Sequence, residues 1–487
     1  MSALATRIER EVGRELTPAE IFNISAAREI TLSRLLTLYI CTGLAFMLLP
    51  GTFLGVWNLI TISTHHSTET VSAAWIQAHG HAQIFGWIGT FILGIGFYSI
   101  PKFRRLNSFG LSAVYTAWGL WTAGVSVHWL CTVYGWHWRT LLPASAAFEL
   151  AAFLIFFRTV SGHRPEDSGK RSLEPWVFVV IAGTIGLLAT LVLNMGISIW
   201  LAVRSLSPAI PAGLDQKVLV LQAWGFLVPF VWGFSAKWLP VFLGLQPTKG
   251  KVLLAAVGIN TAGLLAAFVG WMELAVVSFV FATGVAINAL GLFAHHEKPA
   301  KLNGVHFSLP FFVRLAYVWA MVAALLGVWA AYTDNAHGIW GASRHALTVG
   351  FLSTMVFAIG QRVLPAFSGM KLLFSTKLMF AALSFLTIGC ALRVASEVLA
   401  YQGFLHSAWS WLPVSALTEM SAVTLFAINL ASTFMSKRPS SDDWAAASSG
   451  RLSPSGPFRN TLVTKVIVSV RDEIYCVLGS KHERANR

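Results

Sequence analysis

Charged residues are scarce in this sequence of 487 residues. Asp, Glu, Lys and Arg together make up 11% of it, whereas soluble domains carry roughly 25%. A water-soluble enzyme is therefore excluded. Hydrophobic residues reach 55%, and at about 20 apolar residues per bilayer crossing they predict an all-α, polytopic membrane protein with about 12 transmembrane helices.

Cysteine is scarce as well. The four cysteines form no CxxC pair, which excludes the usual iron–sulfur, zinc and dithiol spacings. Acidic residues are outnumbered, and the net charge is +14. Nucleic acid is not the expected partner, because the positive-inside rule accounts for the basic residues as cytoplasmic loops. Residues 1–32 lack the apolar core of a secretory signal, so the first membrane helix is expected to direct its own insertion.

Long apolar runs separated by Gly, Pro and charge predict about twelve helices. Residues 1–32 are expected to form a cytoplasmic N-terminal segment, 33–435 the transmembrane domain, and 436–487 a flexible cytoplasmic tail. No internal repeat is apparent along the chain. The expected helices are 33–60, 72–100, 108–131, 141–158, 175–203, 218–244, 252–270, 273–294, 308–332, 342–363, 374–399 and 412–435.

The loops differ in charge from one side of the membrane to the other. One set contains little beyond Arg139, Arg204 and Lys217. The positive-inside rule then assigns the other set, and both termini, to the cytoplasm. That basic set is Lys102, Arg104, Arg105, Arg158, Arg164, Lys170, Arg171, Lys249, Lys251, Lys298, Lys301, Arg362, Lys371 and Lys377.

Four histidines fall inside the expected hydrocarbon layer: His79, His81, His128 and His345. A histidine is costly there and indicates function. His79 lies on the order of 10 Å below the outer start of its helix, and His345 lies within about a turn of that depth. Both can therefore meet in one layer, which His128 shares.

Two neutral imidazoles on opposite faces of a macrocycle are the natural axial pair of a low-spin haem. His79 lines up with Gln83, Gly86, Thr90 and Phe97, a small and polar stripe that would let a flat ring approach. His81 lines up with Phe85, Ile88, Ile92 and Ile95, which indicates apolar packing or a lipid face. We therefore favour His79 with His345 as haem ligands, and His81 as a supporting group or a ligand of a separate metal. The alternative is that these histidines only hydrogen-bond between helices.

Other ionisable residues lie near the same layer. Arg344 and Arg393 are suited to hold haem propionates, which favour arginine forks; the alternative is that they snorkel to the interface. Glu149 and Glu419 each lie about two turns from the outer face. A carboxyl at that depth indicates a protonated group, a proton path or a metal ligand.

These motifs resemble known membrane proteins. Twelve helices with His-Gly in the second and a histidine in the tenth are similar to the catalytic subunit of haem-copper oxidases. The run Ala78-His79-Gly80-His81-Ala82, with Arg344-His345-Ala346-Leu347-Thr348-Val349-Gly350 and the later Gln361-Arg362-Val363-Leu364-Pro365, resembles the NnrS family. This resemblance implies a haem-copper-oxidase-like bundle in a bacterial inner membrane, with haem b and copper, and a role in the nitric oxide response or in electron transfer. His79, His81, His128 and His345 are the candidate metal ligands.

The sequence also departs from the oxidases. The expected sixth and seventh helices contain no histidine, so the three-histidine copper site cannot be built from them, and terminal oxidase activity is not expected. Two other classes stay open: a proton-coupled secondary transporter that uses the histidines, Glu149 and Glu419, and a haem- or copper-handling assembly factor. The sequence leaves open whether nitric oxide is bound, reduced or sensed, and which partner donates electrons.

The charge bias predicts the orientation of the chain. Reporter fusions after residue 68 should localise to the periplasm and fusions after residue 168 to the cytoplasm, because the basic loops stay inside. Alkaline phosphatase and fluorescent-protein fusions measure this. The reverse pattern would invert the side of every histidine.

Overall fold

The structure is a computed structural model that describes residues 18–104, 109–161, 174–294, 298–302, 304–333, 338–368 and 371–436. Within these ranges every regular element is a helix. The expected tail, residues 436–487, falls outside them apart from its first residue, as do residues 1–17 of the N-terminal segment.

The described residues form twelve long helical rods, four of which contain a π-helical segment. Two short 3-10 turns, η2 (Thr68–Thr70) and η6 (His406–Ser410), lie in loops. The rods in chain order are α2 (Pro18–Phe46) with η1 (Met47–Phe53) and α3 (Leu54–His65); α4 (Ala73–His81) with η3 (Ala82–Gly89) and α5 (Thr90–Arg104); α6 (Leu111–Tyr134); α7 (Trp138–Ser161); α8 (Pro175–Arg204); α9 (Ala212–Val220) with η4 (Leu221–Leu227) and α10 (Val228–Leu243); α11 (Gly250–Phe268); α12 (Met272–Leu290); α13 (Leu309–Thr333); α14 (Gly338–His345) with η5 (Ala346–Ser353) and α15 (Thr354–Phe367); α16 (Thr376–Tyr401); and α17 (Trp411–Met435).

The expected all-α membrane bundle is confirmed. Eleven of the described rods are long and apolar enough to cross a membrane, and α6 is the twelfth rod. The break expected near Gly270 separates α11 from α12. The first helix begins at Pro18 instead of 33, because a helix continues past the apolar stretch that sequence reading detects.

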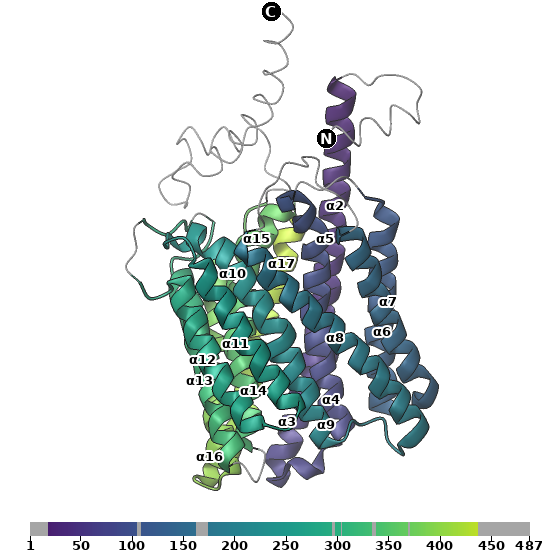
Figure 1. Ribbon diagram of the computed structural model, residues 1–487, viewed down its shortest axis with the longest axis vertical. Coiled ribbons are helices and arrows are strands. Elements are labelled where there is room, and N and C mark those ends of the chain that lie inside the picture. The colour runs from purple at the N-terminus through teal and green to yellow at the C-terminus, as the bar shows by residue number, and fades with distance from the viewer. Residues whose placement is uncertain are drawn as a thin grey trace, which may run out of the picture.

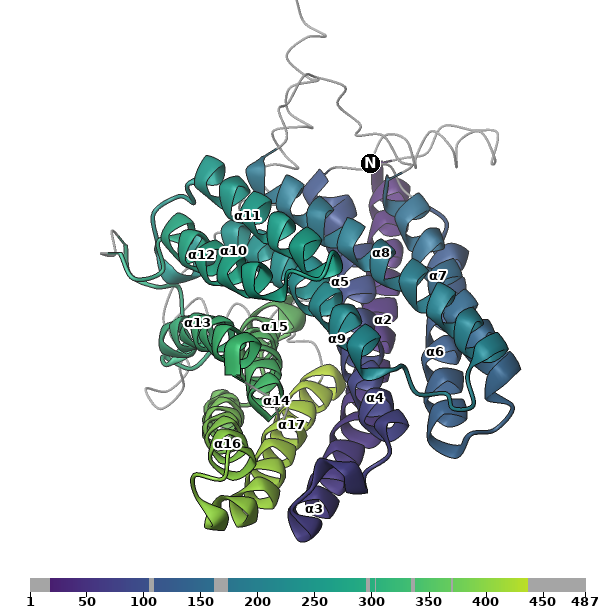
Figure 2. The ribbon, with the colours of Figure 1, turned by 60° about the horizontal axis from the view of Figure 1, so that its bottom comes forward.

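The rods run side by side along one direction, and α2 begins at the same end of the bundle at which α17 finishes (Figure 1). The opposite end, at the bottom of that view, holds α3 and the starts of α4, α9 and α14. Figure 2 shows the last rod, α17, beside α3 of the first rod, and the two are in contact. The chain thereby closes on itself around a shared apolar core.

The π-helical segments occur in the first, second, sixth and tenth rods. In the second and tenth, η3 and η5 start directly after His81 and His345. A π turn inserts a residue into the α ladder and changes which face the following residues present, a feature often found at functional sites.

Glycine allows α8 and η4 to pack with their backbones in contact. A Cβ on Gly186 of α8 would lie 1.9 Å from the carbonyl oxygen of Gly225 in η4. No side chain fits at that distance, so this glycine allows the two backbones to touch. Small residues at helix interfaces are the usual means of close packing in membranes.

Replacing Gly186 by Ala should therefore force α8 away from η4 and destabilise the protein by roughly 1–3 kcal/mol. Gly196→Ala on the same helix is the matched control, because no atom lies within 4 Å of a Cβ there. Thermal unfolding in detergent measures both. Equal midpoints for the two variants would show that the α8–η4 contact is not a constraint.

Candidate functional site

The four membrane histidines lie on three rods near the end where α4 and α14 begin. His79 and His81 belong to α4, His128 to α6, and His345 is the last residue of α14. They form two groups. We call His79 and His345 the inner pair, and His81, His128 and Glu149 the HHE cluster.

Both histidines of the inner pair form hydrogen bonds through Nδ1 to other groups of the protein. His79 Nδ1 lies 2.8 Å from the carbonyl oxygen of Gly51. His345 Nδ1 lies 3.0 Å from the Gly341 carbonyl and 3.1 Å from Glu397 Oε2. These acceptors place the ring proton on Nδ1 of each histidine. The lone pair of each ring is therefore on Nε2, where that of His345 faces Arg393.

The inner pair is only partly enclosed. His79 lies within Coulombic reach of His345 and of Arg393. A Cβ on the next residue, Gly80, would meet no atom within 4 Å. The His345 side chain keeps 25% of its surface exposed although it lies in the membrane bundle.

A buried ion pair adjoins His345. Arg393 Nε lies 3.0 Å from Glu397 Oε1, and Arg393 Nη2 lies 3.4 Å from His345 Nε2. Glu419 of α17 lies within Coulombic reach of this group, and its Oε1 has no hydrogen-bond partner. Cys390 packs beside the His345 carbonyl. Sequence reading pointed to Arg393 and Glu419 but assigned no role to Glu397, which orients His345.

The Arg344 side chain has different partners from the Arg393 side chain. Its guanidinium donates a hydrogen bond to Gln216 of α9, and Asp215 lies within its Coulombic reach. The two arginines that the sequence pointed to are thus held by different helices, and only Arg393 reaches His345.

The HHE cluster lies on the other side of α4, between α6 and α7. His81 Nε2 is 2.8 Å from Glu149 Oε1. The His81 and His128 rings stack with their centroids 3.5 Å apart and their planes 1° from parallel. The exposed fractions of His81, His128 and Glu149 are 7%, 8% and 0%. Ligand atoms of all three lie within 4.8 Å of one another.

The helix faces below His79 and around His81 have other neighbours than the sequence indicated. A Cβ on Gly86 would lie 2.9 Å from Phe46, so the small stripe below His79 packs against the first rod there instead of facing open space. The stripe that contains His81 faces the protein, since Phe85 and Ile88 are buried; the lipid-face alternative is wrong. Helix periodicity separates two faces but does not say which neighbour covers each.

A repeated motif, not apparent on reading along the chain, explains how the glutamates are placed. Residues 142–149 and 412–419 both read Leu-Pro-x-Ser-Ala-x-x-Glu. Glu149 packs against Gly124, and Glu419 packs in the same way against Gly389. Four residues after these glycines, on the same helix face, stand His128 and Arg393. His81 and His345 correspond likewise, each directly before a π segment.

The contact between a glycine and a side chain of the following helix occurs a third time, with apolar residues. Gly263 of α11 packs against Phe279 of α12 as the other glycines pack against glutamates. The residue four positions after Gly263 is Ala267, and Val220 precedes the π segment η4. Phe279 stacks instead on Trp224, with ring centroids 4.5 Å apart. The three equivalent glycine contacts therefore carry different side chains. They are the HHE cluster beside Gly124, the cluster of Arg393, Glu397 and Glu419 beside Gly389, and the stack of Phe279 on Trp224 beside Gly263.

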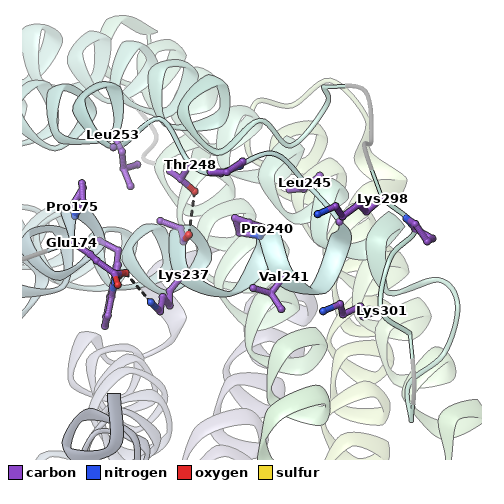
Figure 3. Close-up of a pocket in the computed structure, with 16 residues that line it drawn as sticks. Glu174, Pro175, Lys237, Pro240, Val241, Leu245, Thr248, Leu253, Lys298 and Lys301 are labelled. Atoms are coloured by element: carbon purple, nitrogen blue, oxygen red, sulfur yellow. Dashed lines mark hydrogen bonds and ion pairs between the residues drawn. The ribbon is translucent and has the colours of Figure 1, made fainter. Parts of the chain in front are cut away.

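A surface pocket lies at the opposite end of the bundle, where α8 begins and α10 ends. Figure 3 shows Glu174 beside Lys237 at one side of it, and Lys298 and Lys301 at the other. Lys237 Nζ is 2.7 Å from Glu174 Oε2, and this hydrogen bond lowers the pKa of Glu174. The pocket contains none of the four membrane histidines.

Comparison with known proteins agrees with this architecture. A solved structure of a heme-copper terminal oxidase dimer is similar with a TM-score of 0.50 and 10% identity, over 84% of this chain and 85% of that one. At this identity the likeness shows the fold alone. No curated protein sequence matches the chain. The profile of the family described as NnrS protein matches residues 38–438, and the chain therefore belongs to the NnrS family.

Proposed function

We propose that this protein holds a b-type haem between α4 and α14, where His79 and His345 would bind its iron. One observation carries the proposal: both histidines hydrogen-bond through Nδ1 to acceptors within the chain, which puts the lone pair of each ring on Nε2. At His345 this Nε2 is contacted by Arg393 Nη2 at 3.4 Å, and a bound iron would take the place of that contact. Histidines that bind metals almost always donate their other ring N–H to a carbonyl or a carboxylate. Glu397 supplies such a carboxylate to His345.

The surrounding residues fit the same group. Gly55 lets the His79 imidazole stand close to the backbone of the first rod, since a Cβ there would lie 2.6 Å from the ring. Arg393 contacts His345 and lies within Coulombic reach of His79, which makes it the better-placed partner for propionates, whereas Arg344 is hydrogen-bonded to Gln216. When bound, a haem held by two histidines supplies one-electron chemistry.

The chain's own residues would then orient and tune the group. Glu397 fixes the tautomer and ring angle of His345 and shares its charge with Arg393. A carboxylate on an axial histidine makes that ligand more basic. The expected functional class is nitric oxide binding or electron transfer at the periplasmic face of a bacterial inner membrane, with both termini cytoplasmic. The nitric oxide link rests on family membership.

Neither alternative class is favoured by a specific observation. A proton-coupled transporter would use the buried carboxyls as carriers, yet Glu149 is hydrogen-bonded to His81 and Glu419 adjoins the Arg393 ion pair. An assembly factor would handle haem or copper without keeping them. An optical spectrum of the purified protein separates the classes, because a plain transporter has no Soret band.

Replacing His345 or His79 by Ala should abolish the low-spin haem signal, because each change removes one axial nitrogen. His81→Ala is the matched control, since it removes a histidine of the same helix that faces α6 and α7 instead. Reduced-minus-oxidised optical spectra and low-temperature electron paramagnetic resonance measure the signal. An unchanged spectrum after His345→Ala would overturn the ligand assignment. Equal loss in His81→Ala and His79→Ala would overturn the choice between the two faces.

Oxygen reduction is a separate test. The sixth and seventh rods, in which the oxidases carry their copper-binding histidines, contain no histidine in their described residues. We expect no oxygen consumption above the rate of a haem-free control with ascorbate as reductant. An oxygen electrode measures it, and sustained turnover would contradict the expected absence of an oxidase centre.

A further inference from the structure

The HHE cluster presents polar atoms that nothing in the described protein satisfies. His128 Nδ1 and Glu149 Oε2 are buried and have no hydrogen-bond partner. An unsatisfied polar group costs roughly 1–3 kcal/mol when buried, and each such group in a native protein calls for an explanation. Both belong to the HHE cluster, in which one ligand atom of each residue lies within 4.8 Å of the other two.

The equivalent cluster indicates what is missing. Where α6 carries His128, α16 carries Arg393, and its guanidinium pairs with Glu397 and lies in reach of Glu419. The positive charge that balances the glutamates there is therefore part of the chain. Beside Glu149 the same position holds an imidazole, which is a metal ligand and carries no fixed charge.

We propose that His81, His128 and Glu149 bind one divalent transition-metal ion. Two imidazole nitrogens and one carboxylate oxygen form the ligand set of catalytic zinc sites and of non-haem iron sites, and the same set suits Cu²⁺. The ion supplies beside Glu149 the charge that Arg393 supplies beside Glu419. The site lies on a different face of α4 from the inner pair and does not depend on the haem.

The local packing prepares this site. Gly124 brings α7 close, since a Cβ there would lie 2.8 Å from Glu149 Cγ. His81 also stacks on Phe85, with ring centroids 4.6 Å apart, so apolar surface surrounds the polar atoms. Because the two imidazole planes are parallel, a shared ion requires His128 to turn about its Cβ–Cγ bond. No hydrogen bond to its Nδ1 opposes that turn.

Three protein ligands leave at least one coordination position for a further ligand. Sites with this arrangement bind water or a small substrate, whereas structural zinc sites use four protein ligands. The class of ligand expected on the ion is thus a small donor molecule or an anion.

The test is a Cu²⁺ titration of the full-length protein in detergent after chelator treatment. Cu²⁺ is chosen because it binds tightest among the divalent first-row ions. His66 and His406 approach each other at the surface, with ring centroids 4.8 Å apart, and would bind Cu²⁺ themselves. Both are therefore replaced by Ala in every sample. The titration is repeated with His79→Ala and His345→Ala added, which separates metal binding from haem binding.

One equivalent of Cu²⁺ should bind whether or not His79 and His345 are present. Electron spin-echo modulation should show two imidazole nitrogens on the copper. Glu149→Gln and His128→Ala should each weaken binding by at least about tenfold, as loss of a ligand does at least as much as loss of an outer partner. Glu419→Gln, the same change in the equivalent motif, should leave binding unchanged.

Several results would overturn the proposal. These are no stoichiometric Cu²⁺ binding, an unchanged affinity in Glu149→Gln, or an equal loss in Glu419→Gln. If His128→Ala fails to fold, the nitrogen count in the parent protein decides: modulation from fewer than two imidazoles contradicts the site. Loss of Cu²⁺ binding only in the variant without His79 and His345 would assign the metal to the inner pair.

Discussion

The hydrocarbon interior offers no hydrogen bonds, so each buried polar side chain in this bundle depends on another part of the protein for a partner. The histidine layer follows from this constraint. His79 turns to the carbonyl of Gly51, in the π segment of the first rod, and His345 to the carboxylate of Glu397. Each bond settles the tautomer of a ring and thereby which nitrogen faces the interior. Because Nδ1 carries the proton and donates it to these acceptors, Nε2 is the nitrogen that can act as an acceptor or a metal ligand.

The glutamates obey the same constraint through glycine. Gly124 and Gly389 let α7 and α17 approach so closely that Glu149 and Glu419 reach the neighbouring helix. Where the motif carries Phe279, the same approach yields only an aromatic stack. One packing geometry thus occurs three times with three kinds of side chain. The same glycine-mediated helix contact therefore occurs at three places, and the side chain that packs on the glycine, Glu or Phe, decides which chemistry each place can support.

Two histidines on one short helix serve different neighbours. His79 and His81 are two positions apart, about 200° around the helix, so His79 contacts the first rod at Gly51 and Gly55, whereas His81 faces α6 and α7. This separation lets the bundle keep a pair suited to haem next to a cluster suited to a metal ion without a shared ligand. The π segment that follows shifts the remainder of the rod relative to both.

The sequence alone determined the class of fold. Long apolar runs predicted the rods because hydrophobicity along the chain decides insertion, independently of which helix packs on which. The motifs around His79 and His345 also pointed to the family. Rod ends were less accurate, as at Pro18, since a helix can extend beyond its apolar part.

Only the tertiary structure decided which residues meet. Lateral contacts join residues far apart in the chain, such as His81 with Glu149, and no local pattern encodes them. From the sequence, the helix face that carries His81 could point to lipid or to protein. The contacts of His81 with Glu149 of α7 and His128 of α6 show that it points to protein. The repeated Leu-Pro-x-Ser-Ala-x-x-Glu motif is present in the sequence, but it became apparent only from the structure, because the glycine that each glutamate packs against lies on another helix.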